Sequence, residues 1–179
     1  QGFFNIPVDE LSAMPIHVRY LHDKELKDPV VVAVDIGISK RARNLAERLD
    51  APLAIVEKRR VGNDGSTEQL NIIGEVRGKT AILMDDEVDT AGSMTGAADT
   101  LIKAGVTEVY ACATHGLLSG NAAERVFASP IRELILTDTV LVPPEKHDGR
   151  ITVLSVAGLF GEAIHRIHGG MSVGAMFDD

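Results

Sequence analysis

Short apolar runs alternate along the chain with segments whose apolar residues recur every three or four positions. The runs are rich in β-branched residues, which is typical of strands buried on both faces of a sheet. They cover residues 30–34, 52–56, 79–84, 106–114, 133–138 and 151–156. The helix-like segments cover residues 39–49, a stretch from Met94 that ends at Gly105, residues 121–127 and residues 157–168. This alternation predicts a three-layer α/β domain with a mostly parallel sheet, which binds ligands beyond the carboxyl ends of its strands.

One polar segment, residues 58–69 (KRRVGNDGSTEQ), has two glycines and no periodicity. We predict that it is a long mobile loop, and loops of this length in compact domains are usually functional or disordered. On the residues alone, the cluster of Lys58, Arg59 and Arg60 is better explained as a solvated basic patch at the end of a strand.

The densest group of candidate functional residues lies at residues 82–96 (ILMDDEVDTAGSMTG). Asp85 and Asp86 end a buried strand, and carboxylates either accept hydrogen bonds from vicinal hydroxyls or bind magnesium. Residues 89–93 (DTAGS) follow, and small residues there let a ligand approach the backbone. A helix begins at once, and its free N–H groups and positive dipole end attract an anion. We therefore predict a ligand with a diol at one end and a phosphate at the other, which is a phosphorylated sugar.

The alternative for this segment is an ordinary strand–helix turn in which Asp and Ser cap the helix. One cap would account for one such residue. The segment instead has three aspartates, a threonine and a serine within nine positions. The functional interpretation is therefore preferred.

Composition narrows the classes of function. The chain has 179 residues, of which 45% are hydrophobic and 25% charged, as is typical of one globular domain. A net charge of −8 without a basic stripe argues against a nucleic-acid partner. No apolar run approaches the length of a membrane span, and Gln1 does not begin a leader pattern. The single cysteine, Cys112, suits a reducing compartment, so we expect a cytoplasmic protein.

Further motifs occur in a definite order along the chain. They are GFFNIPVD at residues 2–9, Asp35-x-Gly37-x-x-Lys40-Arg41-Ala42, Lys58-Arg59-Arg60, NIIG at residues 71–74, THG at residues 114–116 and RIH at residues 166–168. This order resembles that of the ribose-phosphate diphosphokinase, or PRPP synthetase, family. The resemblance runs through essentially the whole chain but covers roughly the C-terminal half of that family's length. Residues 85–93 also resemble the loop that binds PRPP in type I phosphoribosyltransferases.

The resemblance implies an activity and a set of partners. Members of the family join ribose 5-phosphate to the pyrophosphoryl group of Mg-ATP, which gives PRPP and AMP. The chain, residues 1–179, would be the C-terminal, ribose 5-phosphate-binding half, with the type I phosphoribosyltransferase fold. Its partners would be ribose 5-phosphate, ATP, Mg²⁺, the N-terminal half and further copies in a homo-oligomer, which is a hexamer in the family. The helix at residues 157–168 would pack against the N-terminal half or a partner.

The resemblance also assigns roles to individual residues. The loop that holds the 5-phosphate is matched by Asp89, Thr90, Ala91, Gly92 and Ser93. Asp85 and Asp86 match the acidic pair that faces the ribose hydroxyls, and Asp35 matches a magnesium-binding carboxylate near the transferred pyrophosphate.

Lys58 and Arg60 match catalytic cations on a flexible loop, and Arg60 is also counted among the ribose 5-phosphate-binding residues. Transfer between phosphates depends on charge stabilisation and alignment, which a closing lid that carries Lys and Arg can supply. With the resemblance, this interpretation replaces the solvated basic patch.

Two other functions stay open. The chain could belong to a true phosphoribosyltransferase, which uses PRPP rather than making it. It could also be a non-catalytic regulatory subunit that resembles a PRPP synthetase and binds sugar phosphate. Lys58 and Arg60 argue against the regulatory subunit, because such a subunit has no use for a catalytic lid.

Several features depart from the family or imitate other sites. Ile38 stands where the family usually has a second glycine, and a β-branched residue would be costly there if the backbone needed a positive φ. Residues 74–80 resemble a P-loop, but three residues rather than four separate the glycines and an apolar run follows, so we reject this motif. Cys112 and His115 are spaced like metal ligands, but no second pair accompanies them.

Overall fold

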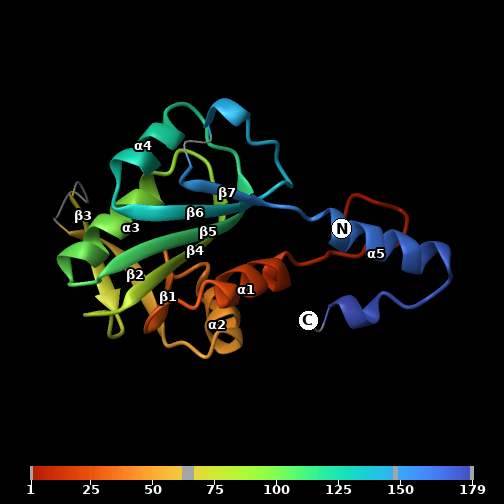
Figure 1. Ribbon diagram of the computed structural model, residues 1–179, viewed down its shortest axis with the longest axis horizontal. Helices are drawn as coiled ribbons and strands as arrows, with labels where there is room; N and C mark the ends of the chain where they lie inside the picture. Colours follow the sequence, from red (N-terminus) through yellow and green to blue (C-terminus); the bar gives the residue numbers. More distant parts are fainter. Residues whose placement is uncertain (1, 62–66, 147–148, 178–179) are drawn as a thin grey trace.

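A seven-stranded sheet lies at the centre of the computed structural model, with the strand order β3-β2-β1-β4-β5-β6-β7 (Figure 1). The structure describes residues 2–61, 67–146 and 149–177, with residues 58–61 and 67–69 described by their backbone alone. The strands are β1 (Pro29–Ala33), β2 (Leu53–Val61), β3 (Thr67–Ile73), β4 (Thr80–Val88), β5 (Glu108–Gly116), β6 (Ile131–Thr137) and β7 (Ile151–Leu154). The helices are α1 (Met14–Asp23), α2 (Ser39–Arg48), α3 (Gly92–Lys103), α4 (Ala122–Ala128) and α5 (Ala157–His168), with short 3₁₀ turns at Pro144–Lys146 and Gly174–Met176.

The sheet is mostly parallel and covered on both faces, as the sequence predicts. Neighbouring strands run parallel except β3, which pairs antiparallel with β2. In Figure 1, α1 and α2 lie on one side of the sheet, and α3 and α4 lie on the other. The central strands are apolar because both of their faces are buried; Val30, Val31 and Val32 have no exposed surface. The three-layer α/β fold is therefore confirmed.

The strand order reverses between β1 and β4. From β1 the chain moves outward to β2, whereas β4 returns to the other side of β1 and leads on to β5. Ala33 of β1 is paired with Met84 of β4, so both strands reach the same edge of the sheet. A crevice opens at such a reversal, and ligands of parallel α/β proteins bind there. Asp35 and Asp85 lie just beyond this pair of residues.

The prediction of a long loop at residues 58–69 is wrong for most of that segment. Strand β2 continues to Val61, and β3 begins at Thr67. The two form a hairpin whose register pairs Glu57 with Asn71 and Val61 with Thr67. Backbone hydrogen bonding at the edge of a sheet needs no apolar pattern, so periodicity carried no signal for these strands. Residues 62–66 lie outside the described part of the chain.

Two further elements differ from the expectation. Helix α1 was not predicted, although Met14, His17 and Leu21 are buried at helical spacing. Strand β4 was expected to end at Met84, but it stays paired with β5 as far as Val88, which lies opposite Gly116. Asp85 and Asp86 are therefore strand residues and not turn residues.

Helix α5 extends away from the sheet (Figure 1). Ala163 is its buried residue, whereas Phe160 is 51% exposed, Ile164 66% and Ile167 63%. Its apolar face is thus uncovered by the described residues. None of the described helices is both long enough and apolar enough to cross a membrane.

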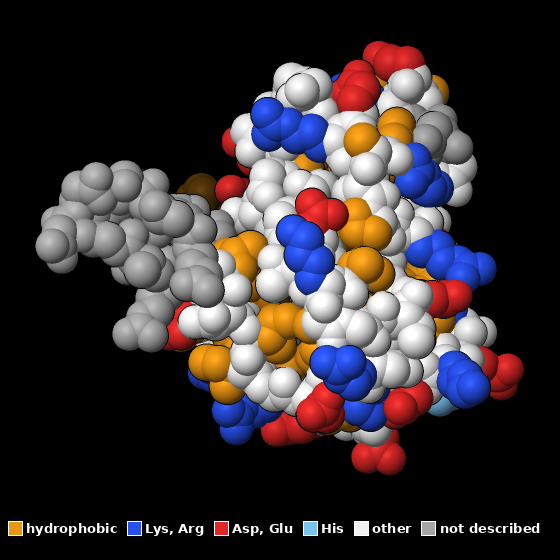
Figure 2. All heavy atoms as spheres, turned by 90° about the vertical axis from the view of Figure 1, so that its left-hand side faces the viewer, with side chains coloured by type: hydrophobic (Ala, Val, Ile, Leu, Met, Phe, Trp, Pro, Cys, Tyr) orange, Lys and Arg blue, Asp and Glu red, His pale blue; other side chains and the backbone are white. Residues whose placement is uncertain are grey.

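The surface carries both charges. On the face shown in Figure 2, Lys and Arg side chains of the described residues are interspersed with Asp and Glu. Among the described residues, the positive charge therefore forms no continuous stripe on this face.

Candidate functional site

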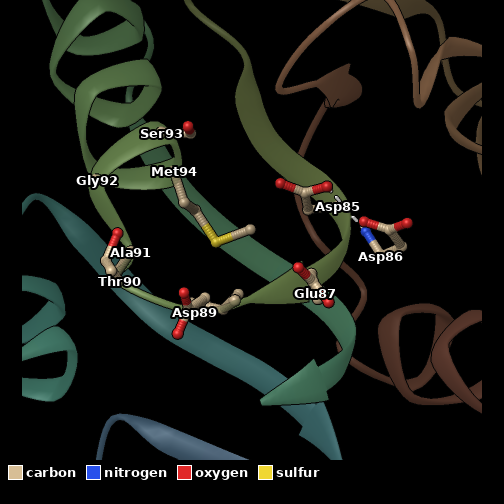
Figure 3. Close-up of a pocket in the computed structure, with 10 residues that line it drawn as sticks. Asp85, Asp86, Glu87, Asp89, Thr90, Ala91, Gly92, Ser93 and Met94 are labelled. Atoms are coloured by element: carbon tan, nitrogen blue, oxygen red, sulfur yellow. Dashed lines mark hydrogen bonds between the residues drawn. The ribbon is translucent and has the colours of Figure 1, made fainter. Parts of the chain in front are cut away.

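A pocket of about 230 Å³ opens where β4 passes into α3. Its lining is one continuous run of the chain, residues 85–94. Figure 3 shows Asp85 and Asp86 on the strand at one side of this unit, Gly92 and Ser93 on the helix at the other, and Asp89 in the turn between them. The structure thus brings together all seven residues of this segment that the resemblance assigned to ribose 5-phosphate.

The two adjacent carboxylates are positioned by the strand and its neighbours. The Asp86 N–H donates to Asp85 Oδ1 at 2.9 Å, and Asp86 Oδ2 lies 3.7 Å from Nη1 of Arg41 on α2. Burial raises the pKa of Asp85 well above its ordinary value, and the nearby charges of Asp86 and Asp35 act in the same direction. A ligand that donates hydroxyl groups here, or a cation, would offset this concentration of negative charge.

The other side of the pocket is the start of α3. Ala91 is the N-cap residue and has no side-chain group that could cap the helix. Thr95 makes a backbone hydrogen bond back to Ala91 O at 3.0 Å, and the N–H groups before it belong to the first turn, which has no intrahelical acceptors. These groups and the helix dipole suit an anion.

Gly92 leaves this helix start open. A Cβ added at Gly92 would lie 3.8 Å from both Thr90 Oγ1 and Arg125 Nη1, which is ordinary contact. Packing therefore does not require a glycine at this position. The role predicted from the sequence, close approach of a ligand to this backbone, stays a prediction.

Asp35 lies two residues beyond the end of β1, at the same edge of the sheet. Its Oδ1 accepts a hydrogen bond from the Ile38 N–H at 3.2 Å. Ile38 has a φ of −87° and caps the start of α2, so the backbone here does not require a glycine. The departure of Ile38 from the family pattern therefore causes no strain in this chain.

The magnesium assignment is tested by the donor set. The described residues contain no group of three or more His, Cys, Asp or Glu side chains that could hold a metal ion. Mg²⁺ commonly takes one or two protein carboxylates and completes its shell with waters and substrate phosphates. An exposed carboxylate such as Asp35 fits an ion of that kind. Cys112, whose spacing from His115 is like that of two metal ligands, is buried within the core.

Lys58 and Arg60 fall on β2. Their backbones are paired with Leu70 and Glu68 of β3. Their side chains lie outside the described part of the structure, so their assignment remains a prediction.

The segment at residues 74–80 leads directly into β4, and no helix follows it. The rejection of the P-loop is confirmed.

One residue that contacts the pocket turn was missed from the sequence. Arg125 of α4 donates from Nη1 to the carbonyl oxygen of Thr90 at 3.2 Å. It is 35 positions from Thr90, and no local motif marks it.

Residues 63–178 match the family model described as the phosphoribosyl synthetase-associated domain. This chain belongs to that family. It is 56% identical over 178 residues to a ribose-phosphate pyrophosphokinase of Caldanaerobacter subterraneus, and the match covers 99% of this chain and 56% of the relative. A ribose-phosphate pyrophosphokinase of Oceanobacillus iheyensis is 52% identical with the same coverage. The chain therefore spans about half the length of these curated relatives.

Solved structures agree with this membership of the phosphoribosyl synthetase-associated family. The phosphoribosylpyrophosphate synthetase of Mycobacterium smegmatis superposes with a TM-score of 0.87 at 35% identity, over 95% of this chain and 55% of that one. The APRTase of Giardia lamblia reaches a TM-score of 0.54 at 16% identity, over 69% of this chain and 77% of that one, which shows a shared fold alone. The resemblance to PRPP synthetases and the type I phosphoribosyltransferase fold are both confirmed.

Proposed function

We propose that this chain is the ribose 5-phosphate-binding half of a ribose-phosphate diphosphokinase. The observation that carries the proposal is the pocket on β4 and α3. It has carboxylates at one side and an uncapped helix start at the other. Hydroxyl groups and a phosphate at opposite ends of one small molecule match this arrangement. The names of the curated relatives, ribose-phosphate pyrophosphokinases, support the same substrate class.

Each side of the pocket recognises one part of the sugar phosphate. Asp85 and Asp86 hydrogen-bond to the ribose hydroxyls through their carboxyl oxygens, which accept hydrogen bonds when ionised. The first N–H groups of α3 and the hydroxyl of Ser93 donate to the 5-phosphate, and bonds of this kind to a charged acceptor are strong. The 1-hydroxyl of the bound sugar is then presented at the crevice beside β1.

The proposed reaction moves the pyrophosphoryl group of ATP to that hydroxyl. The 1-oxygen attacks the β-phosphorus, and the bond from the β-phosphorus to the oxygen that bridges to the α-phosphorus breaks. AMP leaves with the bridging oxygen, and the hydroxyl proton is released. Such a transfer depends on alignment and charge stabilisation more than on covalent help.

The β2–β3 hairpin supplies the cations in this proposal. Arg60 would grip phosphate oxygens with two parallel hydrogen bonds, whereas Lys58 would act as a point charge. Asp35 would hold magnesium that arrives with the phosphates of ATP. When bound, the ion would neutralise part of the phosphate charge.

We also propose that the apolar face of α5 packs against the N-terminal half or a second copy of the chain. Each large apolar side chain left in water forgoes about 1.5–3 kcal/mol of burial free energy. Light scattering over a dilution series should show association that Phe160→Glu weakens. A monomer that the added charge leaves unchanged would contradict packing against a second copy.

The activity is tested on the longer protein to which this chain belongs. With ribose 5-phosphate and Mg-ATP we expect PRPP and AMP in equal amounts. Asp86→Asn should lower kcat/KM for ribose 5-phosphate at least about tenfold, because an ionic hydrogen bond is lost. Asp99→Asn makes the same change on the exposed side of α3 and should have no effect. Consumption of PRPP with a nucleobase would indicate a phosphoribosyltransferase instead, and sugar-phosphate binding without turnover would indicate a regulatory subunit.

A further inference from the structure

The carbonyl groups of the turn between β4 and α3 are all held by other parts of the chain. Val88 O accepts hydrogen bonds from the N–H groups of Leu117 and Leu118, both at 3.0 Å. Asp89 O accepts one from Ser119 N at 2.9 Å. The third carbonyl, Thr90 O, accepts a hydrogen bond from a side chain, Arg125 Nη1, at 3.2 Å. The segment from the end of β5 to α4 therefore sets the direction of these peptide groups.

Ala91 has a backbone conformation that alanine disfavours. Its φ is +62°, in the left-handed region. Rotation of the Thr90–Ala91 peptide by half a turn would change the ψ of Thr90 and the φ of Ala91, and would return Ala91 to an ordinary region of φ. The same rotation would break the hydrogen bond from Arg125. The contact with Arg125 and the strain at Ala91 thus act in opposite directions on one peptide group.

The orientation of this peptide matters for an anion in the pocket. In a trans peptide the N–H points opposite to the C=O. Because Thr90 O points to Arg125 on α4, the Ala91 N–H points away from that guanidinium, and both Thr90 and Ala91 line the pocket. A rotated peptide would present a carbonyl oxygen to the anion in place of an N–H.

We propose that Arg125 is a positioning residue for the phosphate site. It holds the Thr90–Ala91 peptide in the orientation that leaves the Ala91 N–H available to the anion, and its contact offsets the left-handed strain at Ala91. The assignment of the anion as the phosphate of ribose 5-phosphate rests on the proposed function. The peptide orientation itself does not.

The size of the effect follows from the cost of the left-handed conformation. For alanine, the left-handed conformation is about 5- to 30-fold less populated than the ordinary right-handed or extended conformations. Without Arg125, the population of the binding-competent peptide orientation would fall about 5- to 30-fold. The apparent affinity for the phosphate would fall by the same factor. Glycine adopts positive φ readily, so in an Ala91→Gly background the loss should shrink to about twofold.

The test compares Arg125→Ala, Ala91→Gly and the double variant by calorimetry with ribose 5-phosphate and with inorganic phosphate. Arg132→Ala is the matched control, because Arg132 is an exposed arginine that pairs with Glu108. The backbone chemical shifts of Ala91, which report φ, are measured without ligand in the wild type and in Arg125→Ala. We expect Arg125→Ala to weaken binding about 5- to 30-fold and to shift the Ala91 signals towards negative φ. Arg132→Ala should do neither.

The outcomes separate the proposal from the proposed function. If Arg125→Ala causes equal losses with and without the Ala91→Gly substitution, Arg125 attracts the anion directly, and the positioning role would be overturned. Unchanged Ala91 shifts in Arg125→Ala would overturn it as well. If the wild type binds no ribose 5-phosphate while the shifts move as expected, the proposed function fails and the role of Arg125 in orienting the peptide stands.

Discussion

His17 makes the stability of this domain sensitive to acid. It lies on α1 between Met14 and Leu21 on the buried face, and it is 2% exposed. Neither ring nitrogen has a hydrogen-bond partner among the described residues. Burial lowers the pKa of His17 from 6.5 to about 4, because the imidazolium cannot be solvated there.

The sign and the size of the effect follow from this pKa. The folded pKa lies below the unfolded one, so the unfolded chain binds more protons as the pH falls. The stability that depends on a neutral His17 is fully present above pH 6.5 and is lost as the pH falls from about 6.5 to about 4. Relative to neutral pH, the loss of unfolding free energy amounts to roughly 2 kcal/mol at pH 5 and roughly 3 kcal/mol at pH 4.

Urea denaturation at a series of pH values measures this loss. His17→Gln removes the titrating group, and His22→Gln is the matched control because His22 is exposed on the same helix. Between pH 7.5 and pH 5, the wild type and His22→Gln should lose roughly 2 kcal/mol more unfolding free energy than His17→Gln. If all three proteins lose the same amount, His17 is not buried as a neutral group and the reasoning is refuted.

Three further perturbations test the site and the backbone. Gly92→Ala should leave the melting temperature unchanged, because the new Cβ meets nothing closer than 3.8 Å, yet calorimetry should show weaker ribose 5-phosphate binding; equal affinity would mean that no ligand approaches this backbone. Gly74→Ala should cost more than about 2 kcal/mol of unfolding free energy, because the new Cβ would lie 2.9–3.1 Å from Ala54 and Leu53. The control Gly78→Ala, also at positive φ but in open space, should cost about 1 kcal/mol. Equal costs in urea denaturation would count against the packing at Gly74. In the longer protein, steady-state kinetics of Lys58→Ala and Arg60→Ala should show a lower kcat with little change in KM for ribose 5-phosphate, and a raised KM with kcat intact would make these residues substrate contacts only.

The pocket could be predicted from the sequence because its lining is local. Asp85 to Ser93 form one strand, one turn and one helix start, so their order along the chain already places them together. The continuation of β4 to Val88 was missed, because polar residues at the end of a strand look like a turn when the pairing with β5 is not known.

Other features depend on contacts that local patterns do not encode. Arg125 reaches Thr90 only because α4 packs beside α3 in the folded chain. The β2–β3 hairpin is defined by its backbone pairing and not by apolar alternation. The apolar pattern of α5 predicted its helix correctly, but the same pattern would arise on a helix that packs on its own sheet.

The central claim is that β4 and α3 form a site for a sugar phosphate, and calorimetry of this chain with ribose 5-phosphate tests it most directly. The account predicts one molecule bound per chain. It also predicts that Ser93→Ala and Asp89→Asn change the affinity, with Ser93→Ala weakening it about tenfold through the loss of a charge-assisted hydrogen bond. Asp99→Asn, on α3 but outside the pocket lining, should bind like the wild type. No binding, or one affinity shared by the wild type and all three variants, would contradict the claim.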